Sequence, residues 1–427
     1  MRGNRTIKLW KWVPSLYYAE GLPYAFVMIV SSVMYKNLGI SNSDIALYTS
    51  WLYLPWVIKP LWSPLVDILK TKRFWIIIMQ LIIGASLAGI ALTLPTENAF
   101  KYSLAFFWLM AFSSATHDIA ADGFYMLGLS SHAQAWWIGI RNSFYRFAII
   151  TGQGLLVMLA GVLNDWTGEM AMAWSILFGC LAILFLLLGL YHNSQLPNPK
   201  SDQSHVNQNI RLVIKKFLSV FTSFFKKPGI VLIVCFILFY RFGEAQLVKI
   251  SPLFMLDDFT TGGLGLSNIE LGFINGTIGI IMLTLGGITG GLLASKHGLK
   301  YWIFWMALAM KLPDIVYVFM AFIQPDNNFL ITTFVAVEQF GYGFGFTAYL
   351  LFMMMISEGE HKTAHYAICT GFMALGMMIP GMFSGALQEA IGYQSFFIWV
   401  MVATIPGLVL IKFLKIDPVY GIKKEME

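Results

Sequence analysis

Short polar segments divide the sequence into twelve long apolar stretches. Each has about the length of roughly 20 residues that an α-helix needs to cross the hydrocarbon core of a bilayer. Lipid offers no partners to backbone N–H and C=O groups, so such stretches must be helical there. They lie near 12–36, 44–66, 74–94, 101–127, 136–163 and 171–191, and near 229–256, 268–294, 301–323, 329–356, 364–387 and 395–415. The sequence therefore predicts an all-α integral membrane protein.

Charged residues are too scarce for a soluble protein of this length. They make up 12% of the 427 residues, against 58% hydrophobic residues, whereas soluble domains contain about 25% charged residues. Most of the exterior must therefore face lipid. The sequence has no G-x-x-x-x-G-K-S/T phosphate loop and no C-x-x-C pair, so direct use of ATP, a cofactor and a metal centre are not predicted.

The positions of lysine and arginine predict the orientation in the membrane. If the N-terminus is cytoplasmic, nearly all basic residues of the loops lie on the cytoplasmic side, and only Lys36 and Lys101 lie opposite. Cytoplasmic loops of membrane proteins carry such an excess of lysine and arginine. The net charge of +6 then reflects topology rather than a nucleic-acid partner. We expect a multi-pass protein of the inner membrane with an uncleaved first helix and both termini in the cytoplasm.

A longer polar and basic segment separates two groups of six stretches. The predicted domains are an N-terminal six-helix bundle over 1–191, a cytoplasmic linker over 192–228 and a C-terminal six-helix bundle over 229–427. Apolar residues recur at helical spacing in the linker, with basic residues between them. This pattern indicates an amphipathic helix, which could lie on an anionic membrane surface or simply connect the bundles.

The two halves also carry similar segments after their first stretch. Ser41 precedes Asp44 by three residues, and Ser267 precedes Glu270 by the same spacing. Both arrangements are typical of a capped helix start. Their recurrence at corresponding places indicates a duplicated six-helix unit.

This organisation resembles the major facilitator superfamily, a family of twelve-helix transporters. The family carries a G-x-x-x-D-x-x-G-R/K-R/K signature between helices 2 and 3, with an echo between helices 8 and 9. Here the second copy runs from Gly291 through Gly298 to Lys300, and the first retains Asp67 and Arg73 without the glycines. The resemblance implies a gating role for these five residues.

Three motifs in chain order resemble the branch of AmpG-type muropeptide permeases and acetyl-CoA transporter relatives. They are EGLP at 20–23, PWVIKPLWSPLVD at 55–67 and SATHDIAAD at 114–122. The resemblance implies a monomeric secondary transporter that imports anhydro-muropeptides of peptidoglycan recycling together with protons. The small-molecule substrate, protons and the bilayer would then be its partners.

Two other functions are compatible with the sequence. One is a superfamily transporter or exporter for another metabolite or a drug. The other is a membrane-embedded enzyme that modifies a lipid or a glycan. Such an enzyme needs a polar catalytic cluster at one interface, and the loops here are short and poor in such groups. We therefore expect a transporter and no enzyme.

Charged side chains inside membrane helices are costly and mark functional positions. The carboxylates that we predict to take part in proton coupling are Glu20, Asp118, Asp122 and Glu338. Asp118 and Asp122 share one helix face, where two carboxylates cannot both ionise easily. Alternatively, Asp118 forms a structural ion pair with an arginine, and Asp122 lies at the cytoplasmic mouth.

A second set of polar residues could bind substrate. Arg141 and Arg146 are five residues apart, so their side chains point roughly 140° apart on a helix; one could pair with Asp118 while the other binds an acidic group. The substrate candidates are Arg141, Arg146, Lys59, Tyr17, Tyr24, Arg241, Glu244 and Gln339. The i,i+3 spacing of Arg241 with Glu244, and of Lys311 with Asp314, favours internal ion pairs instead.

Histidines and one proline complete the candidates. His117, beside Asp118, could be a hydrogen-bond partner or a proton relay. His361 and His365 have a spacing used by metal ligands, but no third ligand is at hand, so we expect a solvated helix end. Pro380, followed by glycine, could bend its helix as a gate or merely kink it.

Overall fold

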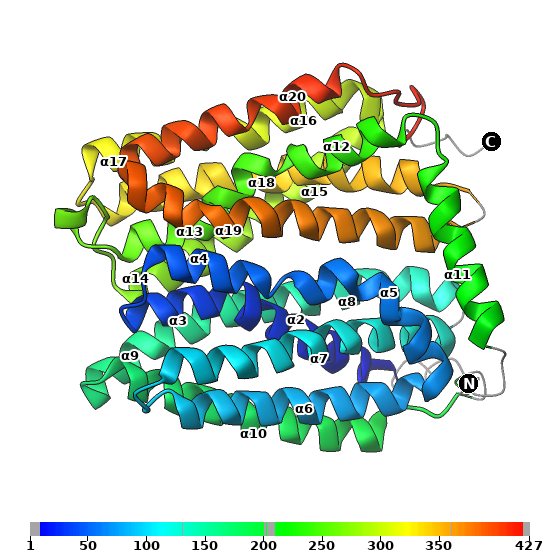
Figure 1. Ribbon diagram of the computed structural model, residues 1–427, viewed down its shortest axis with the longest axis horizontal. Helices are drawn as coiled ribbons and strands as arrows, with labels where there is room; N and C mark the ends of the chain where they lie inside the picture. The colour runs from blue at the N-terminus through cyan, green and yellow to red at the C-terminus, as the bar shows by residue number, and fades with distance from the viewer. Residues whose placement is uncertain (1–8, 130, 200–201, 203–209, 360, 422–427) are drawn as a thin grey trace. The chain divides into compact units, whose positions relative to one another are not determined.

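The computed structural model describes residues 9–129, 131–199, 202, 210–359 and 361–421. Within these ranges all secondary structure is helical (Figure 1). The chain forms two compact units, one of Met1–Leu38 with Ile58–Ile214 and one of Gly39–Val57 with Lys215–Glu427. The segment Gly39–Val57, which the sequence analysis assigned to the N-terminal bundle, thus groups with the second unit. The predicted domain boundaries stay a prediction.

The predicted membrane helices are present in the described ranges. Nine helices there are long and apolar enough to cross a bilayer. One of them, Ala364–Ile411, has 48 residues and changes direction at Gly392, where φ is 74°, so it accounts for the last two stretches. The stretches near 44–66 and 101–127 are also helical. The predicted all-α fold of twelve membrane helices is confirmed.

The first unit contains the helices of the first stretch and of the third to sixth stretches, together with most of the helix over Leu54–Leu69. Its elements are α2 (Val13–Ala25), η1 (Phe26–Val30), α3 (Ser31–Asn37), α5 (Leu54–Leu69, which begins in the second unit), α6 (Lys72–Thr93), α7 (Ala99–Gly128), α8 (Ser131–Ile150), η2 (Thr151–Leu156), α9 (Val157–Thr167) and α10 (Met170–Gln195). Helix α6 packs against α7 and α10, and α2 packs against α8 (Figure 1). Gly21 permits the close contact of α2 with α8, because a Cβ there would meet Tyr145 and Ala148.

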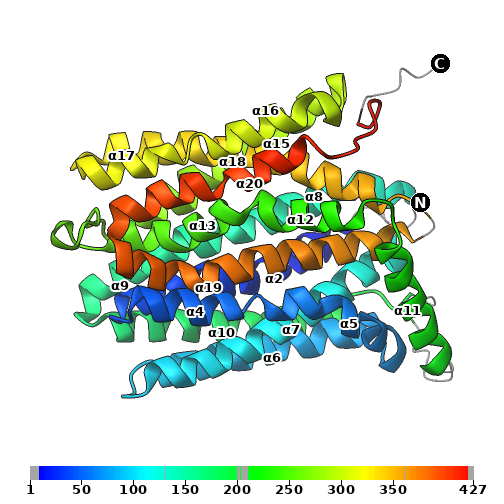
Figure 2. The same ribbon diagram turned by 45° about the horizontal axis from the view of Figure 1, so that its top comes forward.

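The second unit contains the remaining elements. They are α4 (Asn42–Trp51), α11 (Ile210–Phe225, which begins in the first unit), α12 (Ile230–Tyr240), α13 (Phe242–Leu256), η3 (Phe259–Thr261), α14 (Asn268–Leu271), η4 (Gly272–Gly279), α15 (Ile280–His297), α16 (Leu299–Lys311), α17 (Ile315–Ile323), α18 (Asn328–Ser357), α19 (Lys362–Ala403) and α20 (Ile405–Ile411). Helices α15 and α16 pack against α18, while α4 and α13 pack against α19 (Figure 2).

Both predicted helix caps are formed. The Ser41 hydroxyl accepts a hydrogen bond from the backbone N–H of Asp44 at the start of α4. At the start of α14, Ser267 and Glu270 form a complete capping box. Each cap satisfies backbone donors that the first turn of a helix leaves without partners.

Helix α11 spans Ile210–Phe225 within the predicted linker, and the side chains of residues 210–217 lie outside the described part. Its C-terminal end packs onto α19: Ser223 Oγ lies 2.9 Å from His365 Nε2, and the Phe224 ring stacks on Phe372. His365 is 5% exposed, so the expectation of a solvated helix end is wrong there, because α11 covers it. Lys227 donates to the carbonyl of Ile356, and burial lowers the pKa of this ammonium.

Candidate functional site

In the first unit, three helices bring a cation, a carboxylate and an aromatic ring together. Arg141 on α8 lies 2.9 Å from the Asp122 carboxylate on α7. The guanidinium carbon lies 4.4 Å from the centre of the Tyr17 ring on α2, and the Tyr17 hydroxyl donates to Asp122 at 3.3 Å. The guanidinium plane is therefore held from two sides. The described residues offer Arg141 Nε no acceptor, although this nitrogen is buried.

A second ion pair lies one helical turn away on α7. Lys59 Nζ on α5 is 3.5 Å from Asp118 Oδ2, with side-chain exposures of 28% and 13%. Glu20 on α2 is 6% exposed, and its Oε2 has no hydrogen-bond donor among the described residues. Glu20 interacts electrostatically with both aspartates and both cations. The coupling candidates of the first unit thus form one electrostatic cluster.

The two arginines of α8 differ as their spacing predicts. Arg141 is part of the cluster, whereas the Arg146 side chain is exposed. Tyr24 contacts the ring of Tyr145, with ring centres 6.4 Å apart. Tyr125 adds a second ring beside Arg141, at 5.3 Å from the guanidinium carbon. The structure therefore brings the two substrate candidates Tyr17 and Arg141 into direct contact.

Sequence reasoning missed a row of buried polar side chains, connected by hydrogen bonds, that ends at His117. Gln80 on α6 lies 3.0 Å from His117 Nε2, and its carbonyl oxygen lies 2.9 Å from His192 Nδ1 on α10. His192 Nε2 lies 2.9 Å from the Ser15 hydroxyl on α2. All but Ser15 are at most 1% exposed. The isolated Gln80 within an apolar stretch was the signal that could have revealed this row.

The second unit contains a cluster of three carboxylates. Glu244 on α13, Asp314 at the start of α17 and Glu338 on α18 are at most 2% exposed. One oxygen from each lies within 4.8 Å of the others. Gln339 donates to Glu338 at 2.9 Å. These residues, far apart in sequence, were separate candidates in the sequence analysis.

The two predicted i,i+3 ion pairs beside this cluster are wrong. Arg241 donates to the Tyr342 hydroxyl, and Lys311 donates to the backbone carbonyl of Tyr240. Within the described ranges, neither cation comes within 4.0 Å of its predicted carboxylate partner, Glu244 or Asp314. Both side chains are long enough to reach acceptors on neighbouring turns, so spacing alone does not select the partner.

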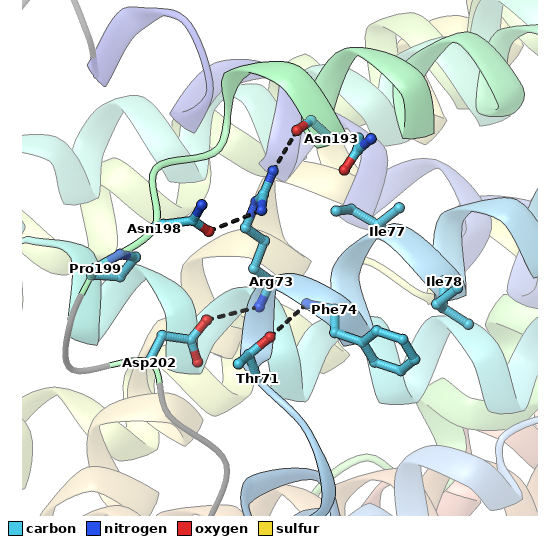
Figure 3. Close-up of a pocket in the computed structure, with 9 residues that line it drawn as sticks. All are labelled: Thr71, Arg73, Phe74, Ile77, Ile78, Asn193, Asn198, Pro199 and Asp202. Carbon is cyan, nitrogen blue, oxygen red and sulfur yellow. Dashed lines mark hydrogen bonds between the residues drawn. The ribbon is translucent and has the colours of Figure 1, made fainter.

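Arg73, the basic residue of the first signature copy, connects α6 to the C-terminal end of α10 and to the segment that follows it (Figure 3). Its guanidinium donates to Asn198 at 2.9 Å and to the carbonyl of Asn193. The Asp202 carboxylate accepts from the backbone N–H groups of Lys72 and Arg73, at 2.7 and 3.0 Å. A pocket of about 460 Å³ lies between these segments. The Asp67 side chain lies outside the described part.

The other gating candidates lie within helices or between two of them. Gly298 ends α15 and begins α16 with φ of 81° and ψ of 163°, a conformation that favours glycine. Gly291 and Lys300 are exposed. Pro380 lies inside α19, which stays helical through it. The gating roles of these residues stay predictions.

Replacing Asp202 with alanine is expected to destabilise the protein by about 1 kcal/mol, the usual cost of losing an N-terminal cap. The carboxylate also interacts favourably with the positive end of the helix dipole. Thermal unfolding of the purified protein in detergent checks this. Asp165→Ala removes an exposed carboxylate and serves as control; equal melting temperatures for the two variants would contradict the capping role.

Comparison with known proteins supports the same class. The family model described as Major Facilitator Superfamily matches residues 17–310. The chain is 24% identical over 404 residues to the anhydromuropeptide permease of Escherichia coli (strain K12), a match that covers 92% of this chain and 77% of that protein. The predicted resemblance to AmpG-type permeases therefore extends well beyond the three motifs.

Two solved structures show how far the fold is shared. A mutant of the nucleoside transporter NupG superposes with a TM-score of 0.71 at 15% identity, over 94% of this chain and 99% of that one. A D-xylose-proton symporter superposes with a TM-score of 0.70 at 14% identity, over 96% and 98%. At such identities the likeness concerns the fold alone.

Proposed function

The chain belongs to the major facilitator superfamily, and we propose that this multi-pass membrane transporter imports anhydro-muropeptides together with protons. The similarity to the anhydromuropeptide permease along most of the chain carries the choice of substrate. We propose that the protein is a monomer in the inner membrane. Its termini would be cytoplasmic, because nearly all basic loop residues lie on the same side of the membrane as the N-terminus. Transport would follow alternating access, as in other transporters built from repeats.

Arg141 is the main substrate contact in this proposal. Muropeptides are sugars that carry a peptide stem, and the stem ends in carboxylates. A guanidinium binds a carboxylate through paired hydrogen bonds, and the rings of Tyr17 and Tyr125 hold this one in place. The substrate carboxylate would compete with Asp122 for Arg141, so binding would change the charge that Asp122 experiences.

Asp118 is the main coupling residue in this proposal. Proton-coupled transport needs a carboxylate that gains and loses a proton as its surroundings change. Asp118 faces Lys59 at 3.5 Å and shares the electrostatic cluster with Glu20 and Asp122. Protonation of Asp118 would release Lys59 from the ion pair, and substrate binding to Arg141 would alter the balance among the three carboxylates.

Uptake of radiolabelled anhydro-muropeptide into membrane vesicles tests the proposal. We expect uptake above that of vesicles without the protein, and accumulation against a concentration gradient when the outside is made acidic. Absence of uptake would remove the substrate assignment. Uptake that does not respond to the proton gradient would remove the coupling assignment and leave the substrate assignment intact.

Replacing Asp118 with asparagine is expected to abolish accumulation driven by the proton gradient. Exchange of external for internal substrate should persist, because exchange needs binding and movement but no net proton transfer. The comparison of the two assays on one vesicle preparation checks this. Asp165→Asn is the control, since its carboxylate is exposed and lies outside the cluster. Driven accumulation by the Asp118→Asn variant would exclude Asp118 from coupling.

A further inference from the structure

The three buried carboxylates of the second unit form a compact group that the proposed substrate site does not use. We propose that Glu244, Asp314 and Glu338 together bind one monovalent cation, either Na⁺ or a proton. This inference goes beyond the proposed function, since it assigns a second cation site to the other unit of the transporter. Its test measures binding and does not depend on muropeptide uptake.

The spacing of the oxygens suits a single ion of the size of Na⁺, whereas a proton would bind to one carboxylate without requiring this spacing. One oxygen from each carboxylate lies within 4.8 Å of the other two. Hard cations of this size bind oxygen ligands at about 2.3–2.6 Å, so oxygens on opposite sides of one ion lie up to about twice that distance apart. The three residues come from α13, the start of α17 and α18, so the helices around the site hold it from three directions.

The carboxylates have acceptor capacity that the protein does not use. The described residues provide no hydrogen-bond donor for either oxygen of Glu244 or of Asp314, although these side chains are 1% and 2% exposed. A buried anionic oxygen without a partner is strongly unfavourable. Glu338 differs, because the side-chain amide of Gln339 donates a hydrogen bond to it. A bound Na⁺ would coordinate oxygens that now lack a partner, and a bound proton would remove the negative charge of one carboxylate.

The local charge favours one positive charge rather than two. Arg241 and Lys311 are the basic groups that act electrostatically on Glu244. With all groups ionised, these two cations leave one of the three negative charges uncompensated. Lys249 lies on the same helix as Glu244, but its ammonium donates to Thr49 at 2.9 Å. Helix α19 adds no acidic or basic residue between His365 and Glu389. A divalent ion would instead leave one positive charge in excess.

Binding of ²²Na⁺ to the purified protein in lipid nanodiscs tests the site directly. Choline chloride keeps the ionic strength constant, and no muropeptide is added. If Na⁺ is the occupant, we expect one ion per chain, and at least a tenfold weaker affinity in the Glu244→Gln and Asp314→Asn variants. Asp326→Asn, an exposed carboxylate of the same unit, is the matched control. Binding that survives both cluster substitutions would overturn the site.

Labelling of the unsubstituted protein with dicyclohexylcarbodiimide keeps the test independent of how the variants fold. This reagent modifies protonated carboxyl groups in apolar surroundings, and peptide mass spectrometry locates the modified residue. For Na⁺, we expect NaCl but not choline chloride to suppress labelling of the cluster at least fivefold. For a proton, labelling should ignore Na⁺, fall as pH rises and saturate at one carboxyl per chain among the three. No Na⁺ binding together with no single saturable label would overturn the proposal.

Discussion

Replacing Arg141 with alanine is expected to reduce anhydro-muropeptide uptake about a hundredfold, since a hydrogen bond to a charged group contributes about 1.5–3 kcal/mol. The guanidinium lies between Asp122 and the Tyr17 ring, so the substitution removes both a preorganised cation and its orientation. The initial rate of uptake into vesicles, measured over a range of substrate concentrations, checks this. Lysine at this position should restore only a small part of the rate, because an ammonium cannot form the paired hydrogen bonds of a guanidinium.

The same substitution should leave the folded protein nearly as stable as before. The Asp122 side chain is 41% exposed, and ion pairs with an exposed partner contribute little to stability. Size-exclusion profiles and melting temperatures in detergent separate a binding defect from a folding defect. Lys101→Ala, which removes an exposed cation of the same unit, should transport normally. Normal uptake by the Arg141→Ala variant would exclude Arg141 from the substrate site.

Replacing Gly343 with alanine is expected to prevent the second unit from folding stably. A Cβ on Gly343 of α18 would overlap the backbone carbonyl of Leu283 on α15, and a Cβ on Gly286 of α15 would overlap the carbonyl of Phe340 on α18. Small residues let helix backbones approach closely inside membranes. Overpacking usually costs about 1–3 kcal/mol, and a clash with backbone atoms cannot be relieved by a change of rotamer, so the cost here should exceed that range.

A matched glycine on α15 provides the control. A Cβ on Gly291 would meet no atom within 4 Å, so Gly291→Ala should keep or slightly raise the melting temperature, because alanine favours a helix more than glycine does. Fluorescence-detected size-exclusion chromatography and thermal unfolding of both variants give the comparison. A Gly343→Ala variant that is monodisperse and melts with the unsubstituted protein would show that α15 and α18 are not packed as closely as described.

The membrane helices were predictable because their causes are local. A backbone in lipid must satisfy its own hydrogen bonds, so an apolar stretch of sufficient length becomes a helix whatever its neighbours. The caps at Ser41 and Ser267 also depend on three or four consecutive residues, and the structure contains both. The stretch Ala364–Ile411 shows where local reasoning was less exact, since its two predicted helices run on through a bend at Gly392.

The partners of the buried charges were not predictable from spacing. Lysine and arginine side chains are long and flexible, and several acceptors lie within their reach once helices pack. Lys311 could have paired with Asp314 one turn away, yet it donates to the Tyr240 carbonyl. His117 was recognised beside Asp118, but its partner Gln80 lies on another helix. Such choices depend on distances between helices that no short sequence pattern encodes.

The sequence by itself thus determined the membrane class, the twelve helices and the residues that carry charge into the bilayer. Only the tertiary structure decided that Arg141 meets Asp122, that Lys59 meets Asp118, and that Glu244, Asp314 and Glu338 converge. The physical reason is the distance along the chain over which each effect acts. Hydrophobicity and helix capping act within a few residues of the chain, whereas the energy of a buried charge depends on every group around it, and packing gathers those groups from distant helices.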